Sequence, residues 1–355
     1  MAGAKVSLPG APPFDAYAIA SFDEPWAMTF MPDGRLLVTE QTGQLFIVDQ
    51  QGNKSAPLAG VPDVDYGGQG GLGDVVLHPD FAENGIVYLS YAEAGEDNVR
   101  GAVVVRGKLT LSDGGGALEN IERVWTQVPK TTGRGHYGHR IAFSDDGFLF
   151  ISSGERQKFT PSQDMQSNMG KVVRLFDDGR VPDDNPFADQ GGVTAEIWSL
   201  GHRNPLGLAF DQSGRLWNSE MGPRHGDELN LVEPGNNYGY PVVSNGDHYN
   251  GDQIPDHDTR PEFDVPAVYW VPAISPAGLI IYDGALFADW RGDAFLGGLS
   301  SKALVRVSID GESAEEAERY PMGKRIREVE QGPDGAIWLL EDEAGGRLLK
   351  LVPKG

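Results

Sequence analysis

The chain has 355 residues, a formal net charge of −23 at pH 7 and no cysteine. The charge argues against a nucleic-acid partner, because phosphate backbones attract basic proteins. The lack of cysteine excludes disulfides, thiolate catalysis and zinc or haem sites held by thiolates, and no apolar run approaches the length of a membrane span. A chain of this length has room for one large domain.

One pattern recurs along the chain: an apolar strand, a turn of the Asp-Gly type and a second apolar strand. Asp-Gly between apolar runs is a strong signal for a β-hairpin. Taken in chain order, the copies cover residues 27–38, 75–89, 141–151, 208–217, 279–296 and 329–340. The repeats therefore predict a chain built mainly of strands, and its 48 glycines and 24 prolines suit the turns between them.

Most copies continue into a further apolar strand, at residues 45–48, 103–105, 172–175, 304–307 and 348–351. Six all-β units predict a six-bladed β-propeller, and a jelly roll or a pair of sandwiches is the alternative. We expect one domain over residues 1–355, in which residues 1–20 are an N-terminal extension or a closing strand. The stretch 241–272, rich in Asp, His, Asn, Gly and Pro, suggests one long loop.

The fourth copy is flanked by residues that suit an anionic ligand. Arg203 and Asn204 precede its first strand, and Gly222 and Pro223 follow its second strand. A hairpin brings these places together, so a guanidinium, an amide and free carbonyls meet at one end. Arginine matches a carboxylate through two hydrogen bonds, and carbonyl oxygens are ligands for Ca²⁺. The hairpin therefore predicts a site that holds a planar anion through a hard cation.

Three other polar residues lie next to glycines: Gln69, His136 and Glu155. His136 is either a general base near neutral pH or a residue that caps backbone groups. Glu155 follows a strand and either orients a base or an arginine, or is a solvated charge. The glycine run around Gln69 lacks the Lys-Ser/Thr of a phosphate loop, so Gln69 either approaches a ligand or belongs to a tight connection.

Arg325 and Arg327 lead into the last copy, and strand alternation puts both side chains on one face. They either reach one anionic ligand together or form a solvated basic face. Glu228, Tyr238 and Tyr240 belong to a stretch whose carboxylate and carbonyl oxygens suit a structural Ca²⁺. The spacing is not that of an EF-hand loop, and Asn-Asn before Tyr-Gly also suits a simple turn.

The order and spacing of these motifs resemble those of the soluble PQQ-dependent sugar dehydrogenases. This family includes the soluble glucose dehydrogenases and, more similar to this chain, the aldose sugar dehydrogenases. The resemblance runs from about Pro25 to Pro353 and rests on PWAMTFMPDGRLLVTE (25–40), GGQGGLGDVVLHPDF (67–81), GHYGHRIAFSDDGFLFISSGER (135–156), GHRNPLGLAF (201–210), SEMGPRHGDELNLVEPGNNYGYP (219–241) and RIREVEQGPDG (325–335). The family fold is a six-bladed propeller, in agreement with the repeat count.

The resemblance implies a role for each matching residue. It implies that His136 is the base that takes the proton from the C1 hydroxyl of the sugar. The carboxylate of Glu155 would support that histidine, and Gln69 would lie beside the quinone and the sugar. Arg203 and Asn204 match the pair that contacts PQQ, with Arg203 near the reactive carbonyl.

The resemblance also implies how the cofactor and its metal are held. Gly222 and Pro223 match the backbone carbonyls that bind the Ca²⁺ bridging to PQQ. Two arginines match those that pair with the PQQ carboxylates: Arg325 and Arg327. Three residues resemble additional Ca²⁺ positions of the aldose branch: Glu228, Tyr238 and Tyr240.

The chain departs from the family pattern in its fifth unit. Where the family has a lysine that contacts PQQ, ungapped alignment from Val305 puts Ser300. Lys302 stands two residues further on and substitutes for that lysine only if the loop is reshaped. We expect the departure to affect the affinity for PQQ rather than the chemistry.

The resemblance implies PQQ- and Ca²⁺-dependent oxidation of the C1 hydroxyl of aldoses to lactones by hydride transfer to PQQ. An external acceptor such as a quinone, a cytochrome or a dye would take the electrons. A Ca²⁺-dependent propeller hydrolase such as a lactonase, and a non-catalytic propeller binding module, are the alternatives. We expect a periplasmic or secreted protein, monomeric or homodimeric, with no membrane span and no nucleic-acid partner.

Overall fold

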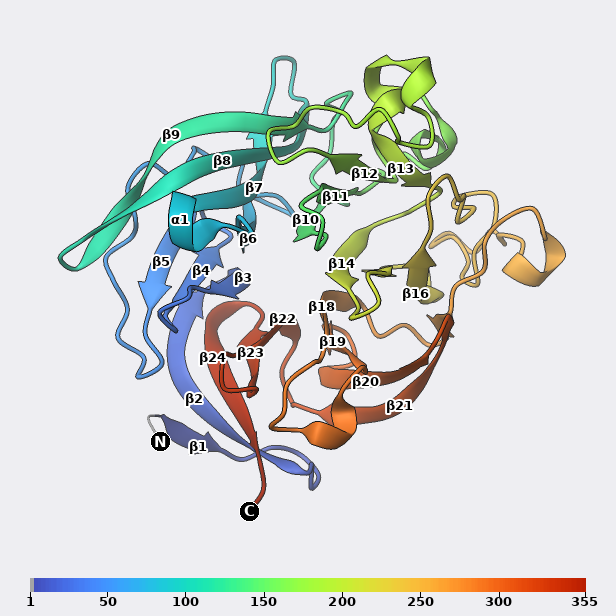
Figure 1. The fold of residues 1–355 in the computed structure, drawn as a ribbon. Coiled ribbons are helices and arrows are strands. Elements are labelled where there is room, and N and C mark those ends of the chain that lie inside the picture. Colours follow the sequence, from blue (N-terminus) through green and yellow to red (C-terminus); the bar gives the residue numbers. More distant parts are fainter. Residues whose placement is uncertain (1–2) are drawn as a thin grey trace.

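Six antiparallel sheets stand around a central axis in the computed structural model, which describes residues 3–355 (Figure 1). Each sheet contains one of the repeats found in the sequence, and we number these blades 1 to 6 in the order of the repeats. The chain is therefore a six-bladed β-propeller, as predicted, and not a jelly roll or a pair of sandwiches.

In each blade the strands follow one another from the axis outwards. Blades 1 and 2 contain β3 (Pro25–Phe30), β4 (Leu36–Glu40), β5 (Gln44–Val48), then β6 (Leu72–Leu77), β7 (Ile86–Ala94), β8 (Arg100–Ser112) and β9 (Gly115–Thr126). Blades 3 and 4 contain β10 (Gly138–Phe143), β11 (Leu149–Ser153), β12 (Lys171–Leu175), β13 (Ile197–Leu200), then β14 (Pro205–Phe210), β15 (Leu216–Glu220), β16 (Asp227–Val232) and β17 (Val268–Trp270). Blades 5 and 6 contain β18 (Pro276–Ile281), β19 (Ala294–Gly298), β20 (Ala303–Asp310), β21 (Ser313–Pro321), then β22 (Ile326–Gln331), β23 (Ile337–Glu341), β24 (Ala344–Pro353), β2 (Phe14–Asp23) and β1 (Ala4–Val6).

The helices are all short. They are α1 (Phe81–Asn84) and the 3₁₀ turns η1 (Thr160–Gln163), η2 (Ala188–Gln190), η3 (Gly192–Glu196), η4 (His257–Thr259) and η5 (Ala288–Trp290). Within residues 3–355, none of the helices has the length and apolar character needed to cross a bilayer.

The first strand of each blade lies at the axis. In order, β3, β6, β10, β14, β18 and β22 each contact the next, and β22 contacts β3, so the innermost strands form a closed ring. The Asp-Gly turns that follow several of them need a residue with positive φ, and Gly34, Gly147 and Gly335 supply it at φ of 84°, 86° and 80°. The chain therefore enters each blade at the axis and builds it outwards.

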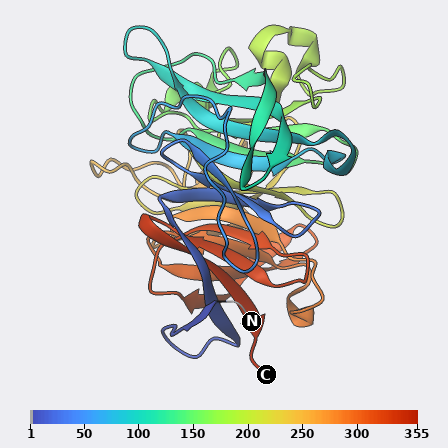
Figure 2. The same cartoon turned by 90° about the vertical axis from the view of Figure 1, so that its left-hand side faces the viewer.

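Blade 6 combines strands from the two ends of the chain. β2 pairs antiparallel with β24, with Phe14 opposite Pro353 and Ser21 opposite Arg347. Both ends of the chain consequently lie close together at this blade (Figures 1 and 2).

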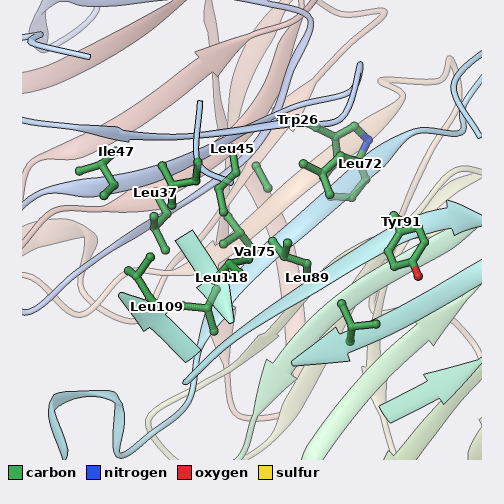
Figure 3. Close-up of a cluster of buried hydrophobic side chains, with 14 of the residues drawn as sticks. Trp26, Leu37, Leu45, Ile47, Leu72, Val75, Leu89, Tyr91, Leu109 and Leu118 are labelled. Carbon is green, nitrogen blue, oxygen red and sulfur yellow. The ribbon is translucent and has the colours of Figure 1, made fainter. Parts of the chain in front are cut away.

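The apolar core lies between the blades rather than in one central mass. Six clusters of buried apolar side chains fill the six contacts between neighbouring blades. Alternation along the strands divides each blade between two clusters. In β4, Leu37 packs toward blade 2, in the cluster drawn in Figure 3, whereas Leu36 and Val38 pack toward blade 6. Each blade is thus buried on both faces.

The stretch 241–272 is more structured than predicted. It contains η4 and β17, and β17 completes blade 4 by pairing with the start of β16. The prediction of one continuous loop is therefore wrong for these residues. A strand of three residues next to Pro272 gives too short an apolar pattern to be recognised before its partner strand is known.

Candidate active site

The topology collects most of the predicted site residues on one face of the ring. Innermost strands begin and second strands end on this face, because the two run antiparallel in every blade. A cavity of about 370 Å³ opens there, and all six blades contribute to its lining. The lining includes Gln69, Arg325 and Arg327 among the predicted residues, and Trp26, His139 and Met221 besides them.

His136 and Glu155 form a buried hydrogen-bonded pair. Nδ1 of His136 lies 2.5 Å from Oε1 of Glu155, and both side chains are almost completely buried. The backbone N–H of His136, which has a φ of 49°, donates to Oε1 of Gln69 at 2.7 Å. Because the carboxylate accepts from Nδ1–H, the other ring nitrogen, Nε2, is left with its lone pair free to accept a proton.

The surroundings favour a neutral His136. Burial, reinforced by the positive charges of Arg203 and Arg156, holds its pKa below the ordinary 6.5, although Glu155 acts in the opposite direction. Burial is the largest single influence on Glu155 and raises its pKa, but its interactions with His136, with the Phe159 N–H and with Arg203 together outweigh burial, so its pKa lies below the usual value. At neutral pH the pair is thus a carboxylate and an uncharged imidazole, as a general base requires.

Arg203 and Asn204 lie in the same buried region and have unused polar atoms. Nη1 of Arg203 donates to the carbonyl of Met221 at 2.9 Å and to the carbonyl of Gly222. Nε of Arg203 and both polar atoms of the Asn204 side chain have no hydrogen-bond partner within the described structure. Buried polar groups are normally paired, so these atoms are available to hydrogen-bond a polar ligand.

The loop that carries Gly222 and Pro223 is held by one buried carboxylate. Oδ1 of Asp227 accepts from the Gly222 N–H at 2.9 Å, and its Oδ2 accepts from the N–H groups of Ile274 and Ser275 at 2.8 and 2.7 Å. Asp227 therefore fixes the Gly222 peptide to the segment that leads into blade 5. The Gly222 carbonyl accepts a hydrogen bond from Arg203.

Arg325 and Arg327 point to a common carboxylate, as strand alternation predicts. Nε of Arg325 and Nε of Arg327 donate to the two oxygens of Asp342, at 2.7 and 2.9 Å. Two cations share this partner, and the second acid near Arg325, Glu343, is mostly exposed. Sequence reasoning missed Asp342, although the hairpin register that puts Ile326 opposite Glu341 would have placed it beside Arg325.

The proposed additional metal positions lie next to a pair of buried acids. Glu220 and Glu228 stand opposite each other in β15 and β16. Burial raises the pKa of Glu220 to about 7, and burial together with the charge of Glu220 raises that of Glu228 to about 8. Ionising both carboxylates at this short distance is energetically unfavourable without a nearby cation, because their negative charges repel each other. The pairing of Glu220 with Glu228 depends on the strand register, so Glu220 could not be recognised as a partner from the sequence.

The hydroxyl groups of Tyr238 and Tyr240 differ in their hydrogen bonding. The Tyr238 hydroxyl donates to the Leu231 carbonyl at 2.5 Å, and its ring stacks on His202, so this side chain is engaged within the fold. The Tyr240 ring lies 5.8 Å from the guanidinium carbon of Arg203, and its hydroxyl has no partner among the described residues. Tyr240 thus belongs with the unpaired groups around Arg203.

The structure does not bring Lys302 or Ser300 into the cavity. Both are exposed in the turn between β19 and β20, and the Ser300 hydroxyl donates to the Ala273 carbonyl at 3.3 Å. From this turn only Leu299 reaches the cavity lining. The positive charge at the cavity therefore comes from Arg325 and Arg327.

Glu228→Gln is expected to stabilise the calcium-free protein more at pH 8 than at pH 5. Because the folded-state pKa of about 8 lies above the ordinary 4.5, the folded protein retains a proton that the unfolded chain releases. The contribution of Glu228 to the free energy of unfolding is therefore fully present below pH 4.5 and is lost progressively as the pH rises to about 8. Removing the carboxyl should gain roughly 1 kcal/mol per pH unit within this window.

Urea unfolding with a chelator, at pH 5 and pH 8, measures this difference in the free energy of unfolding. Glu312→Gln, a change at an exposed residue in the turn between β20 and β21, is the matched control. If Glu228→Gln changes the free energy of unfolding by the same amount at pH 5 and at pH 8, as the control should, Glu228 is not a buried acid with a raised pKa.

The matches to known proteins cover nearly the whole chain. The model of the family described as glucose / sorbosone dehydrogenase matches residues 22–350. Aldose sugar dehydrogenase YliI of Escherichia coli (strain K12) is 41% identical over 340 residues, which are 94% of this chain and 91% of that protein.

Solved structures agree with this match. The soluble aldose sugar dehydrogenase from Escherichia coli in the apo-form has a TM-score of 0.90 and 40% identity, over 96% of this chain and 100% of that chain. The PQQ-bound form of aldose sugar dehydrogenase from Streptomyces coelicolor has a TM-score of 0.80 and 28% identity, over 98% and 100%.

A propeller with a buried His–Glu pair and clustered arginines on one face has the general construction of an enzyme. The matches make this specific: the chain belongs to the glucose / sorbosone dehydrogenase family. The resemblance inferred from the motifs is thereby confirmed, and the protein is a dehydrogenase of this family.

Proposed function

We propose that this protein oxidises the C1 hydroxyl of aldose sugars to lactones with PQQ and Ca²⁺. The observation that carries the proposal is the His136–Glu155 pair, which lies on the same propeller face as Arg203, Arg325 and Arg327. This face combines a neutral base with positive charge for an anionic cofactor. The names of the relatives, aldose sugar dehydrogenases, supply the sugar class.

The residues present fit PQQ, which carries three carboxylates. Arg325 and Arg327 line the cavity and each donates to Asp342 only through Nε, so their outer guanidinium N–H groups can donate to a bound anion. The unpaired polar atoms of Arg203 and Asn204 offer further hydrogen bonds. Charge-assisted pairs of this kind are the strongest a protein offers to a carboxylate.

The residues also fit Ca²⁺. Among residues 3–355 no group of three or more His, Asp or Glu side chains gathers to hold a metal ion, so the proposed ligands for the cofactor metal are carbonyl oxygens. The carbonyls of Gly222 and Pro223 would hold it, and Glu228, Tyr238 and Tyr240 are the candidates for a second ion. Oxygen ligands of this type suit Ca²⁺.

The chain's own contribution to the chemistry is mainly the base. When bound, PQQ supplies a quinone that accepts two electrons from C1 and Ca²⁺ supplies a Lewis acid that polarises it. Nε2 of His136 accepts the proton of the C1 hydroxyl, and Glu155 stabilises the resulting imidazolium. Arg203 orients the reacting groups, and an external acceptor then takes the electrons.

Reconstitution tests the proposal directly. The protein should gain dye-linked activity on a panel of aldoses only when both PQQ and Ca²⁺ are added. The quinone absorbance of the loaded protein should bleach when sugar is added without dye. A loaded protein that neither bleaches nor turns over any aldose would rule out the proposed function.

Replacing Arg325 or Arg327 by alanine is expected to weaken PQQ binding by roughly ten- to a hundredfold. Each charge-assisted contact is worth about 1.5–3 kcal/mol, and about 1.4 kcal/mol corresponds to tenfold. The apparent affinity for sugar at saturating PQQ should change much less. Fluorescence quenching during PQQ titration measures the effect, with Lys302→Ala, outside the cavity, as the control; parent-like binding by both variants would refute the cofactor placement.

A further inference from the structure

Arg156, the residue after Glu155, is a buried cation that the chemistry described so far does not use. It is 1% exposed. Among the described residues, its side chain donates to uncharged oxygens: Nε to the Gly135 carbonyl at 2.9 Å, Nη2 to the Gly133 carbonyl at 2.6 Å and Nη1 to the Arg100 carbonyl at 2.7 Å. Burying a guanidinium without a hydrogen-bonded anion costs free energy, so this side chain is expected to do more than fill space.

The acceptors of this guanidinium belong to the segment that carries the base. Gly133 and Gly135 lie just before His136 in the chain, and the Tyr137 ring, just after it, has its centroid 3.8 Å from the guanidinium carbon. The carbonyl of His136 itself accepts the backbone N–H of Arg156 at 3.2 Å. His136 has a φ of 49°, which a non-glycine residue keeps only when its surroundings fix it. Arg156 therefore holds the chain on both sides of the base.

The preceding residue, Glu155, fixes the side chain of the same histidine. Its Oε1 binds Nδ1 of His136, its Oε2 accepts the Phe159 N–H at 2.7 Å, and its backbone N–H donates to the Arg203 carbonyl at 2.9 Å. Two consecutive residues thus hold the imidazole and the backbone of His136. Because one peptide bond joins Glu155 to Arg156, the imidazole and its carboxylate keep their separation as long as the guanidinium stays in place.

Arg156 also acts on His136 through its charge. The charged groups that act on this histidine are Glu155 and Arg156 after β11 and Arg203 before β14, whereas the segment before β6 contributes the uncharged amide of Gln69. Burial lowers the pKa of His136 most, the two arginines lower it further, and Glu155 opposes them. Replacing Arg156 by an uncharged residue therefore favours the imidazolium and raises the pKa of His136.

We propose that Arg156 is a positioning residue for the base, whose guanidinium holds residues 133–137 in the conformation that aims Nε2 of His136 at the C1 hydroxyl of the sugar. The proposal rests on the proposed function for the identity of the base. Arg156 acts through His136 and contacts neither sugar nor cofactor. An arginine is needed because its planar fork reaches three carbonyls at once, which the single ammonium of a lysine does not.

Two substitutions separate position from charge in the PQQ- and Ca²⁺-loaded protein. Arg156→Met should lower kcat for aldoses by roughly ten- to a hundredfold, because a small misplacement of a catalytic group is costly, and should move the acid limb of kcat/KM to higher pH. Arg156→Lys keeps the charge but not the fork, so kcat should fall while the acid limb stays at its wild-type position. In both variants KM for the sugar and the dissociation constant of PQQ should change by less than about threefold.

Arg180→Met is the matched control, since Arg180 is an exposed arginine beyond the end of β12. It should leave kcat and the pH profile unchanged. If Arg156→Met does not fold, Arg156→Lys decides the matter through kcat. A kcat of Arg156→Lys equal to that of the control refutes the positioning role.

Nitrogen-15 NMR of the histidines, without PQQ, Ca²⁺ or sugar, tests the same contacts without turnover. The signals of His136 are assigned by their loss in His136→Ala. The Nδ1–H tautomer that Glu155 selects should dominate in the wild type and become mixed in both Arg156 variants, and His136 should titrate at higher pH in Arg156→Met only. These NMR changes in a protein that oxidises no aldose uphold the role of Arg156 and refute the proposed function. Aldose oxidation by the wild type, with tautomer and kcat unchanged in the variants, refutes the role of Arg156 alone.

Discussion

Replacing His136 by alanine is expected to lower the turnover of aldoses by about 10²–10⁴-fold, the usual contribution of a positioned general base. PQQ binding should be nearly unchanged, because the imidazole is engaged by Glu155 rather than by the arginines of the cavity. Turnover in the reconstituted variant and PQQ titration of the same sample separate the two effects.

The pH dependence checks the same assignment. Because the pKa of His136 is held below 6.5, the neutral base persists as the pH falls through 6.5, and kcat/KM should decline only at lower pH. His78→Ala is the matched control, since His78 follows β6 and lies at the opposite face of the ring. Wild-type turnover in reconstituted His136→Ala would show that this histidine is not the base.

Removing calcium is expected to abolish activity altogether. The Gly222 loop offers neutral carbonyl oxygens, which bind Ca²⁺ well and give no substitute for its charge when it is removed. Ca²⁺ added together with PQQ should restore activity, and Mg²⁺ should restore less, because it is smaller and demands stricter octahedral geometry.

The calcium experiment needs metal analysis beside the kinetics. After exhaustive chelation the protein should contain no calcium, turn over no sugar and remain folded, since Asp227 holds the Gly222 peptide through a hydrogen bond of its own. Full activity in a sample free of metal would contradict the calcium requirement. Lost activity with lost structure would point to a structural ion only.

Features within one hairpin could be predicted from the sequence. The repeated hairpins with Asp-Gly turns predicted the six blades. Strand alternation predicted that the side chains of Arg325 and Arg327 lie on one side of the strand, where both contact Asp342. Features that depend on strand register could not be predicted, because a shift of one residue reverses every side chain. The pairing of Glu220 with Glu228 and the position of β17 belong to this second kind.

Contacts between distant loops were also beyond sequence reasoning. The Tyr249 ring near Arg203 joins the turn after β16 to the start of blade 4, and no periodic pattern marks either residue. The family motifs pointed to His136 and Glu155 as a pair, whereas the second use of Glu155, in holding Phe159, required the folded backbone.

The pairing of β2 with β24 has a consequence for how the protein is made. Two of the six interblade clusters contain residues of β24: Leu348 lies in one, and Leu349 and Leu351 lie in the other. Until β24 has been synthesised, the apolar faces of blades 1 and 5 are covered only in part, by β22 and β23. Early blades can form locally during translation, but the ring closes only after it. An open array of repeats can lose an end unit and keep the others folded, whereas losing the final strand here opens two interfaces at once and exposes strand edges that favour aggregation.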